Sequence, residues 1–97
     1  MKLSFEPRAR AELVEAARYY RAEAGPSVAE AFSQEFQRTV AKVLENPEAG
    51  AIVANRRRRY LFLRFPYSLI YRLTEDGVHV VAVAHQSRRP NYWARRK

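Results

Sequence analysis

The sequence contains no cysteine, which excludes disulfide bonds and thiolate metal sites. Its two histidines, His79 and His85, lack the spacing of a metal-binding pair, and no cage of carboxylates accompanies them. The three glycines lie too far apart for a glycine-rich phosphate loop, and no serine stands in a nucleophile motif. We therefore expect neither a metal nor another cofactor.

Long apolar runs are also absent. No stretch approaches the roughly 20 apolar residues that span a bilayer. The N-terminal MKLSFEPRAR lacks the apolar core of a signal peptide. Together with the missing cysteines, this pattern predicts a cytoplasmic protein without membrane contact. The 97 residues, 47% of them hydrophobic and 29% charged, are typical of one globular domain spanning residues 1–97.

Acidic residues are scarce in only one half of the chain. Residues 1–50 carry seven basic and eight acidic side chains, a net charge of −1. Residues 51–97 carry eleven basic and two acidic side chains, a net charge of +9. Because clustered like charge opposes folding, such a surface is usually retained for a polyanionic or acidic partner. The alternative interpretation is a basic face that only improves solubility.

The first half predicts a short strand followed by a helix. Lys2–Phe5 alternates in the manner of a strand, and Pro7 suits the first turn of a helix that Gly25-Pro26 ends. The apolar stripe of this helix consists of Ala9, Leu13, Ala16, Ala17 and Tyr20. The charged residues expected to face solvent are Glu12, Glu15, Arg18 and Arg21.

A second helix follows at once. Ser27 and Glu30 predict a capping box at its start, and Asn46-Pro47 ends it. Its apolar stripe consists of Phe32, Phe36, Val40, Val43 and Leu44. Two amphipathic helices with such a short link predict an antiparallel helical hairpin.

The second half changes to a period of two. After a loop at residues 47–55 come three runs rich in aromatic and β-branched residues, Tyr60–Phe65, Ser68–Thr74 and Val78–Ala84. Turns are expected at Pro66-Tyr67 and at Glu75–Gly77, where glycine permits a positive φ angle. The order β-α-α-β-β-β predicts an α+β fold with the hairpin packed on one face of a small antiparallel sheet. The other face is left for binding.

Alternation within these runs predicts which side chains share a face. In the first run the apolar set assigned to the core is Leu61, Leu63 and Phe65, so the set expected on an accessible face is Tyr60, Phe62 and Arg64. In the last run one set is Val78, Val80, Ala82 and Ala84, and the other is His79, Val81, Val83 and His85. The alternation does not assign a side to Arg72.

Two basic clusters supply the candidate binding residues. Arg56–Arg59 have few acidic neighbours to pair with, and guanidinium groups bind phosphate and carboxylate bidentately; the alternative is a solvated loop. Past the last run, arginines alternate with aromatic residues, which suits contact with nucleic acid or another macromolecule. Trp93 has the alternative role of closing an open end of the core. The candidates are Arg56, Arg57, Arg58, Arg59, Arg64, His85, Arg88, Arg89, Tyr92 and Trp93.

Five segments together resemble the RelE/ParE family of bacterial toxins. They are E-L-V-E-A-A-R-Y-Y from Glu12, A-F-S-Q-E-F from Ala31, N-P-E-A-G from Asn46, R-F-P-Y-S-L-I-Y-R from Arg64 and A-V-A-H-Q-S-R-R-P-N-Y-W from Ala82. The resemblance runs from about residue 3 to residue 93, and the family's helical hairpin and sheet agree with the predicted fold.

These families are the toxin halves of type II toxin–antitoxin modules, often described as plasmid stabilisation proteins. The resemblance implies a cytoplasmic bacterial toxin held silent by a cognate antitoxin, whose C-terminal segment wraps the toxin. The antitoxin's N-terminal domain, expected to be of the ribbon-helix-helix type, binds operator DNA, so the toxin is expected to reach operator DNA only through the antitoxin. An acidic, partly disordered antitoxin would neutralise the basic half of this chain.

Members of the family divide into two functions. RelE-like members cut messenger RNA in the ribosome, whereas ParE-like members inhibit DNA gyrase. At the positions where the RelE-like pattern has two lysines and an arginine, this sequence has Tyr60, Phe62 and Ser68. Arg88 matches the pattern clearly and Tyr92 loosely. The ending H-Q-x-R-R-P-x-Y-W is more similar to the ParE side.

We therefore expect a ParE-like toxin that inhibits DNA gyrase by binding, causes growth arrest and has no assigned catalytic residue. One alternative is a ribosome-dependent messenger-RNA endoribonuclease, with the candidate residues Arg88, His85, Tyr92 and Arg64. A second alternative is a non-toxic basic module that binds nucleic acid.

Overall fold

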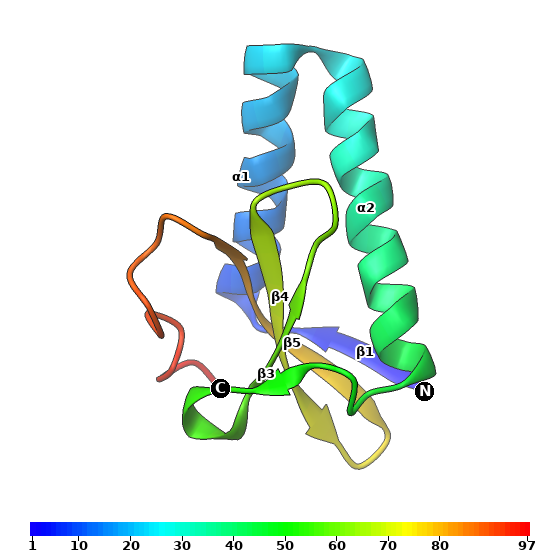
Figure 1. Ribbon diagram of the computed structural model, residues 1–97, viewed down its shortest axis with the longest axis vertical. Coiled ribbons are helices and arrows are strands. Elements are labelled where there is room, and N and C mark those ends of the chain that lie inside the picture. The colour runs from blue at the N-terminus through cyan, green and yellow to red at the C-terminus, as the bar shows by residue number, and fades with distance from the viewer.

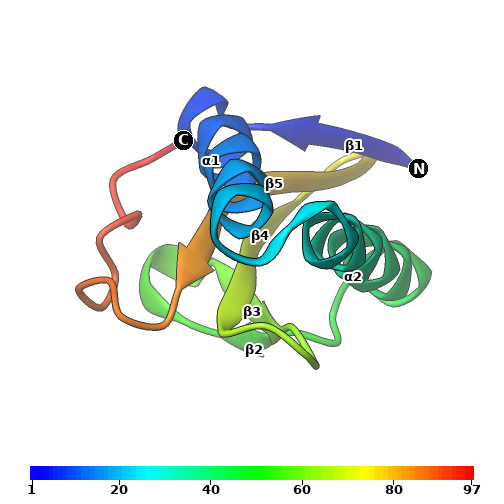
Figure 2. The same ribbon diagram turned by 90° about the horizontal axis from the view of Figure 1, so that it is seen from above.

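Two helices cover one face of a five-stranded sheet in the computed structural model, which describes residues 1–97 (Figures 1 and 2). The elements are β1 (Lys2–Phe5), α1 (Pro7–Ala24), α2 (Pro26–Glu45), β2 (Ala51–Ile52), a 3₁₀ helix η1 (Ala54–Arg56), β3 (Arg58–Leu61), β4 (Tyr67–Thr74) and β5 (Gly77–His85). The strands lie in the order β1-β5-β4-β3-β2. This confirms the predicted α+β fold, but β1 pairs with β5 in parallel, so the sheet is mixed.

The helical hairpin ends where predicted, but α2 begins at Pro26, before the predicted start at Ser27, and lacks the predicted cap. Gly25, with a φ angle of 93°, joins the helices, and Pro26 takes the first position of α2. Because Ser27 then lies inside the first turn, no side chain caps α2, and the predicted capping box is wrong. Glu30 instead accepts a hydrogen bond from the Gln34 amide at 3.3 Å.

The main core lies between the hairpin and the sheet. Both predicted helical stripes face it, and the large buried side chains that meet there include Phe32, Val43, Leu69, Tyr71 and Val80. Aromatic rings from both layers pack edge to face, as Phe32 does on Tyr67 with 5.1 Å between ring centroids. Such pairs add to the stabilisation that burial of apolar area already gives.

The faces predicted for the first run are reversed. β3 begins at Arg58 and ends at Leu61, and its residue Tyr60 pairs with Leu69 on the helix-covered face. Phe62 therefore joins the main core and is 6% exposed, whereas Leu63 is 76% exposed. Phe65 packs against the core from the following loop, as predicted. Apolar character alone assigned the wrong face to this run, because β3 is only four residues long and both Leu63 and Phe65 lie beyond its last paired residue.

A β-bulge changes the facing within β5. The register shifts between Ile70 and Tyr71 of β4, so Val81 is an extra residue opposite them. Beyond it, Val83 joins Val80 in the main core, while Ala82 belongs to the cluster on the other face. The alternation predicted for Val78–Ala84 is therefore wrong after Val81, because a bulge adds one residue to the period of two.

Gly77 is needed for close approach, not for a positive φ angle. It is the first residue of β5 and pairs with Thr74, so the turn consists of Glu75 and Asp76. A Cβ atom at Gly77 would collide with the backbone of Lys2 in β1. Within the predicted loop 47–55, the structure adds β2 and the start of η1. Neither helix combines the length and apolarity that a membrane crossing requires.

Candidate binding site

The chain's own C-terminal segment, residues 86–97, crosses the face of the sheet opposite the helices, here called the open face. In Figure 2 this segment and α2 lie on opposite sides of the sheet. Trp93 is 4% exposed and packs in a second apolar cluster with Ile70, Val81 and Ala84. The expectation that this face is free is therefore wrong at its centre. Trp93 closes the core, and we remove it from the residues able to contact a partner.

Three side chains fasten the C-terminal segment through its main-chain carbonyl groups. Asn55 Nδ2 donates to Ala94 O at 2.9 Å, Arg57 Nη2 donates to Arg96 O at 2.6 Å, and Arg72 Nε donates to Lys97 O at 2.7 Å. Arg72, whose side the sequence left open, thus lies on the open face. These bonds give the segment a fixed path although it contains no regular element.

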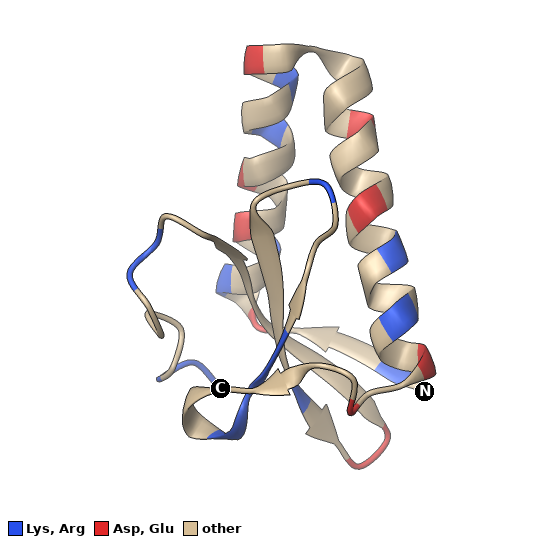
Figure 3. Cartoon of the chain, viewed as in Figure 1, with Lys and Arg blue, Asp and Glu red and all other residues tan.

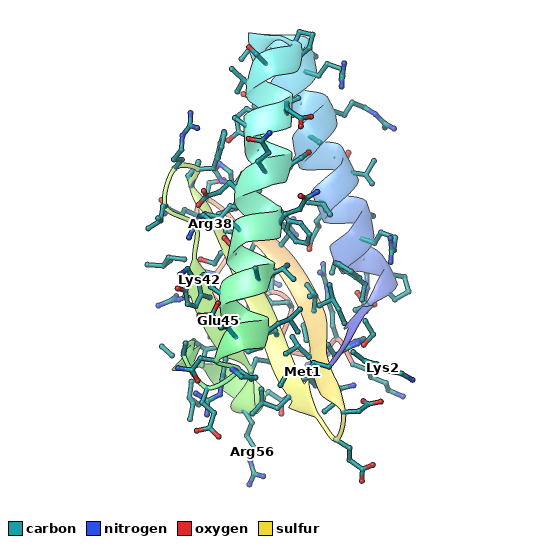
Figure 4. All side chains as sticks on the ribbon, turned by 90° about the vertical axis from the view of Figure 1, so that its right-hand side faces the viewer. Met1, Lys2, Arg38, Lys42, Glu45 and Arg56 are labelled. Carbon is teal, nitrogen blue, oxygen red and sulfur yellow. The ribbon has the colours of Figure 1, made fainter.

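Two arginines of the Arg56–Arg59 run are occupied within the molecule. Arg57 also donates to Asn55 O, and Arg58 Nη1 donates to Glu48 O and to Gly50 O, each at 2.9 Å. The sequence predicted no internal partners because it contains few acidic neighbours, but carbonyl oxygens serve instead. Arg59 and Arg56 stay exposed, and Figure 4 shows Arg56 pointing away from the body of the molecule.

Glu12 of α1 organises the inner side of the segment and was predicted to face solvent. Its carboxylate accepts from both Nη atoms of Arg96, at 2.9 and 3.0 Å, and from the hydroxyl of Tyr92 at 2.7 Å. It also accepts from the backbone N–H of Val83 at 3.0 Å, and Arg88 Nη1 lies 3.8 Å away. The sequence interpretation missed both Glu12 and Arg96, which hold the segment that forms one side of the candidate site.

The free edge of β5 explains the position of Glu12. β1 ends at Phe5, opposite Val80, so the N–H groups farther along this edge of β5 have no strand partner. Glu12 supplies an acceptor to one of them from the inner side of α1. No local pattern signals this role, because Glu12 and Arg96 are 84 residues apart.

The same contacts fix the protonation of the two partners. Burial and the hydrogen bond to Glu12 raise the pKa of Tyr92 far above its ordinary value. Burial by itself would lower the pKa of Arg96, but the hydrogen bonds to Glu12 raise it. Tyr92 is therefore a neutral donor, and Arg96 is a fixed cation. The Arg88 guanidinium lies 3.9 Å from the centroid of the Tyr92 ring. This cation–π contact holds the Arg88 side chain at the edge of the segment.

Between the C-terminal segment and the ends of β3, β4 and β5 lies a cavity of about 330 Å³, here called the arginine cavity. Its floor contains Ser68 and Ala84, and its basic residues are Arg59, Arg88 and Arg89. No acidic side chain lines it. Guanidinium groups around such a hollow suit a carboxylate or a phosphate group.

The structure brings together only part of the predicted site. The candidates that line the arginine cavity are Arg59, His85, Arg88, Arg89, Tyr92 and Trp93. Arg56, Arg57 and Arg58 line a different hollow. Arg64 lies on the β3–β4 loop, with its guanidinium 5.7 Å from the Phe65 ring centroid. Figure 3 shows that the basic residues of the second half gather along η1, β3 and the C-terminal segment.

His85 lies between the cavity and α1. Its Nδ1 accepts the backbone N–H of Ser87 at 2.9 Å and lies 2.8 Å from the Ser87 hydroxyl, and its ring meets Tyr67 edge-on at 4.9 Å. Burial raises the pKa of Tyr67 to about 12, so that hydroxyl stays neutral near pH 7. The accepting Nδ1 indicates an imidazole whose proton is on Nε2.

The family follows from comparison with known proteins. The family model described as ParE toxin of type II toxin-antitoxin system, parDE, matches residues 3–90. The chain belongs to the ParE toxin family. A solved structure described as the chromosomal ParDE TA system from P. aeruginosa shares the fold, with a TM-score of 0.77 and 22% sequence identity; the match covers 88% of this chain and 95% of that one. No curated protein sequence matches this chain. The ParE-like branch expected from the sequence is confirmed.

Proposed function

We propose that this ParE toxin inhibits DNA gyrase by binding it through the arginine cavity, and that it does so in the bacterial cytoplasm. One observation carries the proposal. In a chain of the ParE family, Arg59 and Arg89 border a hollow without any ion pair, while Arg88 lies 3.8 Å from Glu12 and packs on the Tyr92 ring. Guanidinium groups left unpaired beside a concave surface are typical of a site that binds another macromolecule.

The same surface supports neutralisation by an acidic cognate antitoxin. A disordered acidic segment gains charge complementarity and ordered contacts together when it folds onto a basic face. Antitoxin bound over the arginine cavity would compete with the target for Arg88 and Arg89. Occlusion of this kind needs no conformational change in the toxin.

The nuclease alternative rests on His85 and Arg88, which line one cavity. It lacks the two lysines of the RelE-like pattern, because those positions hold Tyr60 and Phe62, which are uncharged and pack toward the helices. Tyr92 is a poor proton donor at neutral pH because its pKa is raised. A binding mechanism requires none of these groups to exchange protons.

The test uses purified gyrase and translated messages side by side. We expect the wild-type protein to block supercoiling and to leave messages intact in primer-extension assays. Arg88→Ala should weaken gyrase inhibition at least tenfold, whereas Arg18→Ala, on the exposed side of α1, should not. The proposal would be wrong if the wild-type protein left supercoiling normal and cleaved messages at codon-linked positions. Loss of that cleavage in Arg88→Ala would then support the endoribonuclease alternative.

A further inference from the structure

A second basic surface lies farther along the open face from the arginine cavity. It consists of two hollows that share Arg72, which is four residues along β4 from the cavity-floor residue Ser68. One hollow, of about 410 Å³, also contains Arg8 and Arg95, and the other, of about 480 Å³, contains Arg56, Arg57 and Arg58. We call these six arginines the Arg72 surface.

Positive charge on the Arg72 surface is almost uncompensated. The only acidic side chain in either hollow is Glu6, which is already bound by Arg8 Nε at 3.1 Å. Burial, together with the charge of Arg72, lowers the pKa of Arg57 and of the neighbouring His79. Arg56 and Arg95 are exposed and make no hydrogen bond or ion pair within the chain through their side chains. Repulsion between these neighbouring cations raises the free energy of the unbound surface, and a bound anion would lower it.

The other side chains in the two hollows distinguish among anionic partners. The hollows contain no phenylalanine, tyrosine or tryptophan, so the only aromatic ring on which single-stranded bases could stack is the partly buried imidazole of His79. Their apolar contribution is limited to Ile52 and Leu73, whereas a protein interface needs a buried apolar or aromatic anchor. A surface rich in arginine and poor in apolar groups fits the phosphate backbone of a duplex.

We propose that the Arg72 surface binds the phosphate backbone of double-stranded DNA directly. This differs from the expectation that the toxin reaches DNA only through its antitoxin. The choice of DNA as the duplex rests on the proposed function, because gyrase acts on DNA. The phosphate contacts rest on Arg56 and Arg95, and the other four arginines, which donate within the chain, add positive charge. The arginine cavity would then bind gyrase, and the Arg72 surface would bind DNA.

The test measures fluorescence anisotropy of a labelled random-sequence DNA duplex, with the full-length toxin, over a series of salt concentrations. Arg56→Glu combined with Arg95→Glu is compared with Arg18→Glu combined with Arg21→Glu on the exposed side of α1, which changes net charge equally. We expect the first pair to weaken binding at least tenfold more than the second. The slope of log K against log salt should also fall by about 2, since each duplex phosphate contact contributes roughly 0.9.

Equal losses in the two double variants would overturn the proposal, as would wild-type protein that does not bind the duplex. Tighter binding to a single strand or to duplex RNA would also overturn it. Each protein is assayed against gyrase in parallel. If wild-type protein binds duplex through Arg56 and Arg95 but does not inhibit gyrase, the proposed function fails and the phosphate-binding surface stands.

Discussion

At the scale of single residues, Glu12 and Trp93 determine where the C-terminal segment lies. Glu12 holds the segment from the helix side through Arg96 and Tyr92. Trp93 anchors it to the open face in the second apolar cluster. Both residues therefore fix the segment that carries Arg88 and Arg89 at the arginine cavity, and neither is itself exposed.

Glu12→Gln should strongly destabilise the protein. The substitution leaves the Arg96 guanidinium, in a residue that is 8% exposed, without a counter-charge. Breaking a buried pair in this way costs about 3–5 kcal/mol. Urea unfolding followed by Trp93 fluorescence measures the loss, and Glu15→Gln, at an exposed position of α1 without an ion pair, serves as the control. Equal midpoints for the two variants would contradict the role given to Glu12.

Trp93→Ala should be as damaging as a core deletion. Truncation of a buried tryptophan typically costs about 3–5 kcal/mol. Trp93→Phe, which keeps most of the apolar volume, should cost less. Thermal unfolding by circular dichroism measures both variants, since the only tryptophan is removed. A loss below about 0.5 kcal/mol, as expected for an exposed residue, would show that Trp93 is a surface contact after all.

At the scale of elements, a carboxylate of α2 fixes the β3–β4 loop. Glu35 accepts a hydrogen bond from the backbone N–H of Leu63 and pairs with Arg38 at 3.0 Å. The Arg38 hydrogen bond, reinforced by the loop N–H groups, lowers the pKa of Glu35 despite its burial. The loop that carries the exposed Leu63 is thus held by an ionised group.

Glu35→Gln should change the pH dependence of stability. Because the folded state lowers the pKa of Glu35 below its ordinary value of 4.5, the carboxylate stabilises the protein above that pH. This contribution is lost as the pH falls through the lower folded value. The difference in unfolding free energy between wild type and Glu35→Gln should therefore be largest near pH 7 and shrink below pH 4.5. Denaturant titrations across this range measure it; a difference independent of pH would refute the assignment.

The sequence predicted the elements that depend on local patterns. The helical stripes, Pro7 at the start of α1 and Gly25 at its end are encoded within a few residues, and the structure has all of them. The capping box failed because Pro26 starts α2 one residue before Ser27. Proline, fixed near a helical φ angle, took the position that the cap would have needed.

Features set by long-range contacts were not predictable in this way. The bulge at Val81 depends on pairing between β4 and β5, and it altered the face of Val83. The path of the C-terminal segment depends on Glu12 and Arg96 and on carbonyl groups that Arg57 reaches across the fold. Charge patterning predicted two basic clusters but did not show that Arg59 of the first lies in one cavity with Arg88 and Arg89 of the second, whereas the alternative that Trp93 closes an end of the core is confirmed.

At the scale of the whole molecule, the helical hairpin forms the core with the sheet, and we propose that the basic second half binds partners. The hairpin covers one face of the sheet and carries both signs of charge (Figure 3). The opposite side presents the arginine cavity and, beyond the C-terminal segment, the Arg72 surface. A net charge of +8 is retained on 97 residues although it opposes folding. We propose that this charge is retained because it forms the surface through which the toxin binds its partners.

Growth arrest on induction tests this account most directly. Arg88→Ala combined with Arg89→Ala removes two cations from the cavity rim, and Arg18→Ala combined with Arg21→Ala removes two from the exposed side of α1. Blue-shifted Trp93 emission in each purified variant verifies that the C-terminal segment is docked. We predict that the α1 variant still arrests growth and that the cavity variant does not. A folded cavity variant that arrests growth as strongly as wild type would contradict the account.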